Sequence, residues 1–183
     1  MRTSIIILLL IFLNSCRGPE PRKPVQTKSG SFFKESIERS RKLLETEEAQ
    51  IQQLIKMDSL KDYTHSASGS WYHYLAVNDS ANYTPKPDDL VVFNYDLLTL
   101  DNDTIYSKDD IGVVTYKVDK QELFQGMRDA VKLLKEKERA TFLFPSSLAF
   151  GYHGDENKIG SNIPLKSTIT ILQIEKQQET KEN

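Results

Sequence analysis

The residues of this chain whose type and spacing could support chemistry lie in its last third, and nearly all of them are apolar. This region contains no nucleophile, no set of metal ligands and no phosphate-binding loop. Rotation about an X-Pro peptide bond suits such a surface, because that reaction needs a shaped, dry pocket more than reactive atoms. The segments concerned are 120–127, 139–145, 148–151 and Ile163-Pro164.

Short β-rich runs and one helix must position these residues. Five runs carry aromatic or β-branched residues, often in alternation, and are separated by Pro, Asn, Asp and Gly. Met127, Ala130, Val131 and Leu134 recur at helical spacing, and their apolar face must be buried against the strands. We therefore predict an α+β fold in which an antiparallel five-stranded sheet wraps on one helix. The predicted strands are 71–77, 90–100, 113–118, 140–144 and 168–175.

A charged amphipathic helix is predicted before this sheet, over residues 31–60. Residues 32–57 contain no Pro or Gly and are rich in Glu, Lys and Arg. The apolar residues that fall roughly on one helical face are Phe33, Ile37, Leu44, Ile51 and Ile55.

The same helix has a partial coiled-coil pattern. Ile37, Leu44 and Ile51 have seven-residue spacing, but the second seam carries Ser40 and Glu47. Two interpretations stay open. The helix either leans on its own domain or serves as a spacer, or it joins two copies of the chain in a dimer.

Residues 1–15 are predicted to be an export signal. Arg2 provides a basic start, residues 5–13 form an apolar run too short to span a bilayer, and Ser15 is small. The only cysteine, Cys16, follows immediately, and residues 13–16 resemble the bacterial lipobox, in which this cysteine is lipidated. We expect acyl chains such as palmitate on Cys16 to hold the protein at a membrane.

Residues 16–30 contain three prolines among polar residues and are predicted to be a disordered tether. Residues 179–183 are predicted to be a polar tail. A net charge of −2, with basic and acidic residues interleaved, argues against nucleic acid as a partner. His65, His73 and His153 lack ligand partners at metal-site spacing, so we expect no metal site and place them on the surface or in loops.

The order of these landmarks resembles the FKBP family of peptidyl-prolyl isomerases. The resemblance is clearest from Val91 to Glu175, and we expect an isomerase domain over residues 66–178. It rests on a series of spaced landmarks, which are Val91-Val92 through Tyr95, Asp101-Asn102 before Ile105-Tyr106, the stretch 121–126, Arg139-Ala140, residues 148–151 and Ile163-Pro164.

The resemblance implies a proline-binding site between the helix and the concave face of the sheet. It also implies that the reaction at this site needs no cofactor. It implies catalytic roles for Tyr95, Tyr106, Leu123, Phe124, Met127, Phe150 and Ile163. It implies substrate-binding roles for Ile105, Val114, Tyr116 and Ile171. Leu123 would act mainly through its backbone N–H, which would donate to a peptide carbonyl.

Three positions depart from the pattern that the resemblance implies. Most active family members have Asp where this chain has Tyr106, Trp where it has Met127 and Tyr where it has Phe150. Phe150 keeps the wall of the pocket but lacks a hydroxyl donor, and Met127 fills its space less rigidly. Two hypotheses therefore stay open: a peptidyl-prolyl isomerase of modest rate, or a non-catalytic FKBP-fold chaperone or envelope scaffold.

Together with the lipobox, the lead-in Gly69-Ser70-Trp71-Tyr72 resembles the gliding-motility-associated isomerase lipoproteins of Bacteroidetes. The implied location is a bacterial cell envelope, with the protein lipid-anchored at the outer membrane and facing the periplasm. The implied partners are polypeptide clients that contain proline.

Overall fold

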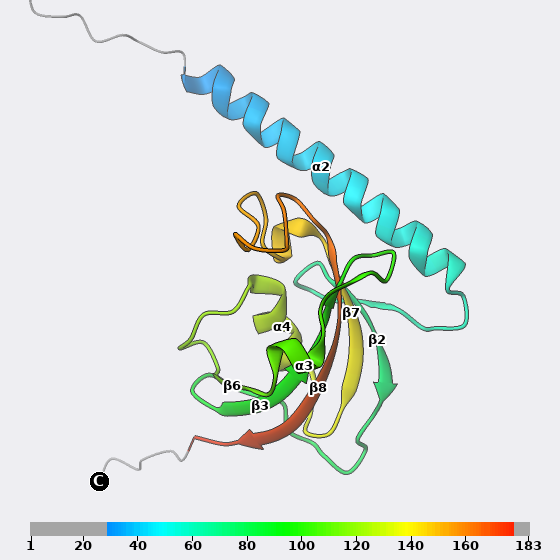
Figure 1. Ribbon diagram of the computed structural model, residues 1–183, viewed down its shortest axis with the longest axis vertical. Coiled ribbons are helices and arrows are strands. Elements are labelled where there is room, and N and C mark those ends of the chain that lie inside the picture. The colour runs from blue at the N-terminus through cyan, green and yellow to red at the C-terminus, as the bar shows by residue number, and fades with distance from the viewer. Residues whose placement is uncertain (1–28, 178–183) are drawn as a thin grey trace, which may run out of the picture. The chain divides into compact units, whose positions relative to one another are not determined.

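The computed structural model describes residues 29–177 (Figure 1). The predicted export signal, Cys16, nearly all of the tether and the polar tail lie outside the described residues. The first described element is α2 (Ser29–Met57), which corresponds to the charged helix predicted over residues 31–60. It begins before the predicted boundary, and it ends earlier because residues 58–61 form a turn in which the Lys61 amide donates to the Asp58 carbonyl.

A single antiparallel sheet follows, in the strand order β1-β2-β7-β8-β3-β6. β8 is the longest strand and pairs with β7 on one side and β3 on the other; Figure 1 shows β8 between these two strands. The strands are β1 (Thr64–His65), β2 (Trp71–Ala76), β3 (Leu90–Tyr95), β4 (Leu97–Leu98), β5 (Thr104–Tyr106), β6 (Val114–Lys117), β7 (Arg139–Phe144) and β8 (Leu165–Glu175).

All five predicted strands are present, so the predicted α+β fold is confirmed. The sheet also contains short strands that the pattern did not predict. β1 and β5 have two and three residues, which is too short for alternation to be recognised. The run predicted over 90–100 is divided into β3 and β4 at Asp96, whose carboxylate accepts a 2.6 Å hydrogen bond from the Thr168 amide.

The main core lies between one face of the sheet and α4 (Gln125–Leu133). Met127, Ala130 and Val131 on α4 are fully buried, as helical spacing predicted. On β7, Ala140, Phe142 and Phe144 belong to this same cluster, as alternation along a strand requires. The helix thus fixes the concave side of the sheet, where the proline site is predicted.

Within residues 38–177, the second half of α2 packs on the other side of the sheet. Ile51 is fully buried against Trp71 of β2 and Leu143 of β7. Leu143 alternates with Phe142 and Phe144, so it points away from α4. The interpretation that the helix leans on its own domain therefore holds for this half of α2.

His73 is a correction to the sequence analysis, which placed all three histidines on the surface or in loops. It lies in β2 with only 4% of its surface exposed, whereas His65 and His153 are exposed. The reason is that the segment after α2 folds back over β2. Tyr63 covers the His73 ring edge-on at 4.7 Å, and burial lowers the pKa of His73.

No helix among the described residues is both long enough and apolar enough to cross a membrane.

Candidate active site

The predicted site residues gather where two apolar clusters meet. One cluster is the core between α4 and the sheet, and the other is built on Leu97, Ile159 and Leu165. Tyr95 and Phe124 pack against both clusters. These two residues come from different elements, the end of β3 and the position just before α4. The junction is therefore an aromatic surface between the sheet and the start of the helix.

Phe124 is the central ring of this surface. Its centroid lies 5.6 Å from that of Phe144, edge to face, and 5.1 Å from that of Phe150, at a tilt of 43°. Tyr95 stacks on Phe93 at 5.6 Å. Burial raises the pKa of Tyr95, so its hydroxyl stays protonated and able to donate at neutral pH. The chain that carries Phe150 leaves β7 through the short helix η1 (Ser146–Leu148).

The eleven predicted residues fall into two layers by exposure. An outer layer is half-buried and can touch a ligand, and it consists of Tyr95, Ile105, Tyr106, Val114, Leu123, Phe124, Phe150 and Ile163. An inner layer is buried and supports it, and it consists of Tyr116, Met127 and Ile171. In this conformation, contact between a ligand and the inner layer needs side chains of the outer layer to move.

Two backbone donors lie beside this surface. Among residues 29–177, the amides of Leu123 and Phe124 find no acceptor, although both residues are half-buried. The Tyr95 hydroxyl likewise makes no hydrogen bond within the described part of the chain. Donors that have no partner within the described chain are available to bind a carbonyl oxygen of a peptide.

Tyr106 brings a carboxylate to the rim of the site. Its hydroxyl donates a 2.5 Å hydrogen bond to Asp155, which belongs to the loop 152–162. The other Asp155 oxygen accepts from the amides of Asn157 at 2.9 Å and Ile159 at 2.7 Å. Lys158 donates to the Ile105 carbonyl at 3.2 Å and lies 4.7 Å from the centre of the Tyr106 ring. The loop is thus fastened to β5 through Tyr106.

The hydrogen bonds of Asp155 determine its charge. Burial by itself would raise the pKa of this carboxyl, but the bonds from Tyr106, Ile159 and Asn157 outweigh it and lower the pKa. Asp155 is therefore ionised at neutral pH and holds a negative charge at the rim. The hydrogen bond to Asp155 raises the pKa of Tyr106.

Comparison with known proteins identifies the chain. Residues 81–172 match the model of the FKBP-type peptidyl-prolyl cis-trans isomerase family. This chain belongs to that family. The match spans β3 to β8 and includes every residue of the predicted proline site. The expectation of an FKBP-type isomerase is thereby confirmed at the level of the family.

Individual relatives of this FKBP chain agree. Over 122 residues, or 66% of this chain and 43% of the relative, it is 30% identical to "Probable FKBP-type peptidyl-prolyl cis-trans isomerase FkpA" of Neisseria meningitidis serogroup B. The chain thus spans less than half the length of that curated relative. The crystal structure of FkpA from Escherichia coli has a TM-score of 0.59 at 18% identity, covering 96% of this chain and 82% of the other. A peptidyl-prolyl isomerase structure from Pseudomonas syringae has a TM-score of 0.56 at 18% identity, covering 75% and 96%.

The departures from the FKBP pattern can now be placed. Met127 is completely buried beneath the aromatic surface, in the core cluster with α4, and Phe150 contributes a ring but no hydroxyl to that surface. Tyr106, where the resemblance implied an aspartate in active family members, donates to the Asp155 carboxylate in the loop 152–162. The candidate site therefore has a carboxylate at its rim, supplied by this loop.

Sequence analysis missed Asp155. Its carboxylate is bonded to amides two and four residues further on, which is a local turn pattern that Asp commonly forms. This local pattern could be recognised in the sequence. The bond to Tyr106 could not, because the two residues are 49 positions apart. Among residues 29–177, no group of three or more His, Cys, Asp or Glu is placed to hold a metal ion.

Proposed function

We propose that this protein catalyses cis-trans isomerisation of X-Pro peptide bonds in unfolded or partly folded client polypeptides. The observation that carries the proposal is the half-buried aromatic surface around Phe124, with the two unpaired amides of Leu123 and Phe124 beside it. A proline ring on this surface sheds water and gains dispersion contacts. The neighbouring amide loses the water that favours its planar form, so that rotation becomes easier.

The energy required is modest for such a site. Uncatalysed rotation has a barrier of about 18–20 kcal/mol, and a rate increase of about 10⁴ needs that barrier lowered by roughly 5.5 kcal/mol. This gain must come from contacts that are stronger with the twisted amide than with either planar isomer. Backbone N–H donors can supply such contacts, because the carbonyl oxygen changes direction as the amide rotates.

A second function is favoured by the departures at Met127, Phe150 and Tyr106. A flexible floor and a wall without a hydroxyl can bind proline without favouring the twisted amide. The alternative is therefore a non-catalytic FKBP-fold chaperone or envelope scaffold that holds clients through the same aromatic surface.

The test of catalysis is the rate of cis-to-trans conversion of a proline-containing peptide, measured with residues 17–183. We expect clear acceleration by the natural sequence. Phe124→Ala should reduce kcat/KM at least tenfold, because Phe124 contacts both Phe144 and Phe150. Phe33→Ala is the matched control, since this ring is 64% exposed on α2. If the conversion is no faster than the uncatalysed reaction while the protein still binds an unfolded polypeptide, the chaperone function is favoured.

We also propose that the protein is anchored in a bacterial envelope by lipid on Cys16, at the outer membrane and facing the periplasm. The lipobox at residues 13–16 supports this, and the proline-rich stretch that follows suits a tether. A role in gliding motility is part of the same proposal and rests on the resemblance to isomerase lipoproteins of Bacteroidetes. Mass spectrometry of the native protein tests the anchor, because a lipidated Cys16 would be the first residue of the mature chain.

Dimerisation through α2 is a further proposal about partners. Phe32, Phe33 and Ile37 are 71%, 64% and 67% exposed at the start of the described helix. Exposed large apolar side chains that lie close together are typical of protein contact surfaces. Analytical ultracentrifugation of the natural chain and of a Phe33→Ser variant measures the proportion of monomer and dimer. We expect the natural chain to form a dimer and the variant to dimerise more weakly. A natural chain that stays monomeric at all concentrations would exclude this contact.

A further inference from the structure

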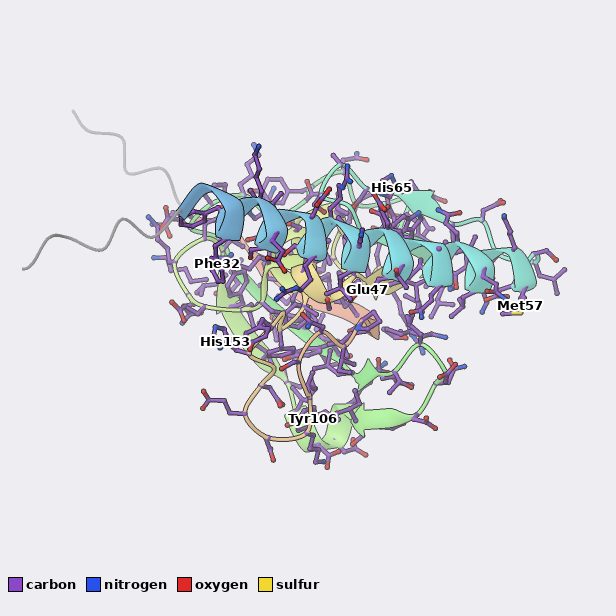
Figure 2. The ribbon with its side chains drawn as sticks, turned by 90° about the horizontal axis from the view of Figure 1, so that it is seen from above. Phe32, Glu47, Met57, His65, Tyr106 and His153 are labelled. Atoms are coloured by element: carbon purple, nitrogen blue, oxygen red, sulfur yellow. The ribbon has the colours of Figure 1, made fainter. Side chains whose placement is uncertain are left out.

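Glu47 is a buried carboxylate in the middle of α2, where Figure 2 shows it on the side of the helix that faces the β strands. Only 3% of its surface is exposed. One of its oxygens accepts a 2.8 Å hydrogen bond from the Ser146 amide, and the other accepts a 2.7 Å hydrogen bond from the Ser146 hydroxyl. Burial of a charge is tolerated only with such partners, so this contact is specific.

Ser146 in turn organises the chain that carries Phe150. Its carbonyl accepts hydrogen bonds from the Ala149 amide at 3.0 Å and from the Gly151 amide at 2.9 Å. These two residues flank Phe150 on both sides. The Gly151 carbonyl then accepts from the Asn162 amide at 2.7 Å, which ties the turn to the end of the loop 152–162.

Phe150 transmits this arrangement to the proline site. Its ring contacts Phe124, the central ring of the aromatic surface. A continuous path of hydrogen bonds and ring contacts thus runs from Glu47 through Ser146 and Phe150 to Phe124.

Packing holds the turn on one side only, where Ala149 and Phe150 lie against the apolar clusters. On the other side, a pocket of about 200 Å³ that is partly open to solvent lies between α2 and the turn, bordered by Leu43 and Leu44 and by Gly151 and Tyr152. The turn therefore has room to shift toward the helix. The two hydrogen bonds to Glu47 are direct polar contacts that resist such a shift.

We propose that Glu47 is a positioning residue of the isomerase site, and that α2 is a working part of that site as well as a connection to the N-terminus. This inference rests on the proposed function, because it concerns the wall of the proline site. Glu47 touches no client. It fixes Ser146, which fixes the two amides around Phe150 and thereby the distance from Phe150 to Phe124.

The first test is Glu47→Met in the full chain. Met is also unbranched and similar in length, but it has no carboxylate oxygen to accept from Ser146, so both hydrogen bonds are lost. Gln is unsuitable, because its oxygen could accept from the Ser146 amide while its NH2 group donates to the Ser146 hydroxyl. We expect kcat/KM for a proline-containing peptide to fall about tenfold at a temperature where the variant is fully folded. Glu45→Met is the matched control, because Glu45 is exposed and its one ion pair within residues 29–177 is with Arg41 on the same helix, at 3.7 Å. An unchanged kcat/KM in folded Glu47→Met would overturn the proposal.

A double-mutant cycle with Phe150→Ala distinguishes positioning from general weakening of the fold. If Glu47 acts through Phe150, Glu47→Met should lower kcat/KM much less when Phe150 is already Ala. If the two losses in kcat/KM simply multiply, Glu47 does not act through Phe150 and the proposal fails. Should Glu47→Met not fold, Ser146→Ala removes only the hydroxyl contact and takes its place in the cycle.

Hydrogen exchange gives a readout that does not need isomerase activity. In Glu47→Met, the amides of Ala149 and Gly151 should exchange about tenfold faster, while amides of β7 and β8 keep their rates. If the natural chain proves inactive, the proposed function fails but this measurement still decides whether Glu47 holds the turn. Unchanged exchange at both amides would refute the positioning role.

Discussion

At the scale of single residues, the pair Tyr106 and Asp155 determines the polar character of the site. Three hydrogen bonds converge on the Asp155 carboxylate, one from a side chain and two from backbone amides. The two amide bonds shape the loop 152–162 locally. The bond from Tyr106 joins this loop to β5, beside the bond from Lys158 to the Ile105 carbonyl.

Tyr106→Phe removes this side-chain bond and keeps the ring. The Asp155 pKa should rise toward its ordinary value, because one of the donors that stabilise the charged form is gone. An NMR titration of the Asp155 carboxyl measures this directly. Tyr152→Phe is the control, since Tyr152 is 74% exposed and should leave the Asp155 pKa unchanged. An equal pKa in the natural chain and in Tyr106→Phe would show that the bond contributes nothing.

At the scale of elements, the start of α4 depends on the absence of a side chain at Gly126. A Cβ atom there would lie 2.5 Å from the Phe144 ring and 2.9 Å from the Leu148 carbonyl oxygen. The helix start is therefore in direct contact with β7 and with η1. Phe124, directly before the helix, takes its place on the aromatic surface because of this close approach.

Gly126→Ala should destabilise the domain by about 1–3 kcal/mol, which is the usual range for inserting a methyl group into a packed contact. Isomerase activity should also fall, because the shift of α4 moves Phe124. Urea unfolding measures the first effect. Gly160→Ala serves as control, since the nearest atom to its added Cβ is the Ile163 Cγ1 atom, at an ordinary contact distance of 4.0 Å. Equal stability of the two variants would contradict the tight contact.

A second element-scale contact joins the ends of β3 and β8 through Asp89, which is 2% exposed. Its carboxylate accepts from the Tyr83 hydroxyl at 2.7 Å, the Lys86 amide at 2.9 Å and the Gln177 amide at 2.8 Å. Burial would raise the pKa of Asp89, but these bonds outweigh it and lower the pKa. The stabilisation is therefore present above the unfolded pKa of about 3.9 and is lost as pH falls through the lower folded pKa.

Asp89→Asn should destabilise the protein by about 1–3 kcal/mol at pH 7, because Asn cannot accept all three hydrogen bonds. The difference from the natural chain should shrink as pH falls below about 4, because Asp89 becomes protonated first in the unfolded chain and then, at its lower pKa, in the folded protein. Urea unfolding at several pH values measures both effects. Asp88→Asn is the neighbouring control, since within residues 29–177 the Asp88 side chain makes surface ion pairs with Lys117 and Lys120 and no hydrogen bond to a backbone amide. A pH-independent difference would show that the charge of Asp89 is not involved.

At the scale of the whole molecule, the packing of Ile51 makes the second half of α2 part of the FKBP domain. Ile51→Ala leaves a cavity against Trp71 and Leu143 and should lower the free energy of unfolding by about 2–4 kcal/mol. A single unfolding transition, shifted as a whole, is expected by circular dichroism. The same change at Ile37, which is 67% exposed, should have little effect. A separate early transition of the helix, with the main transition unmoved, would contradict this coupling.

The fold was largely predictable because its main elements carry local patterns. Met127, Ala130 and Val131 are buried on one face of α4, as their helical spacing required, and Phe142 and Phe144 alternate with Leu143 in β7. Short elements were missed where the pattern is brief. The helix α3 (Lys108–Ile111) is capped reciprocally by Ser107 and Asp110, a four-residue signal that the sequence contains but from which no helix was predicted.

The sequence by itself indicated the family, the positions of the main strands and of α4 along the chain, and the apolar residues of the predicted site, since these depend on residue types at fixed local spacing. Only the tertiary structure decided which polar groups meet. Glu47 looked like a defect in a coiled-coil seam, yet it binds Ser146, which is 99 residues further along the chain, and Asp155 meets Tyr106 across 49 residues. Such pairs leave no periodic trace, because they depend on how the folded chain brings distant segments together and removes water from between them.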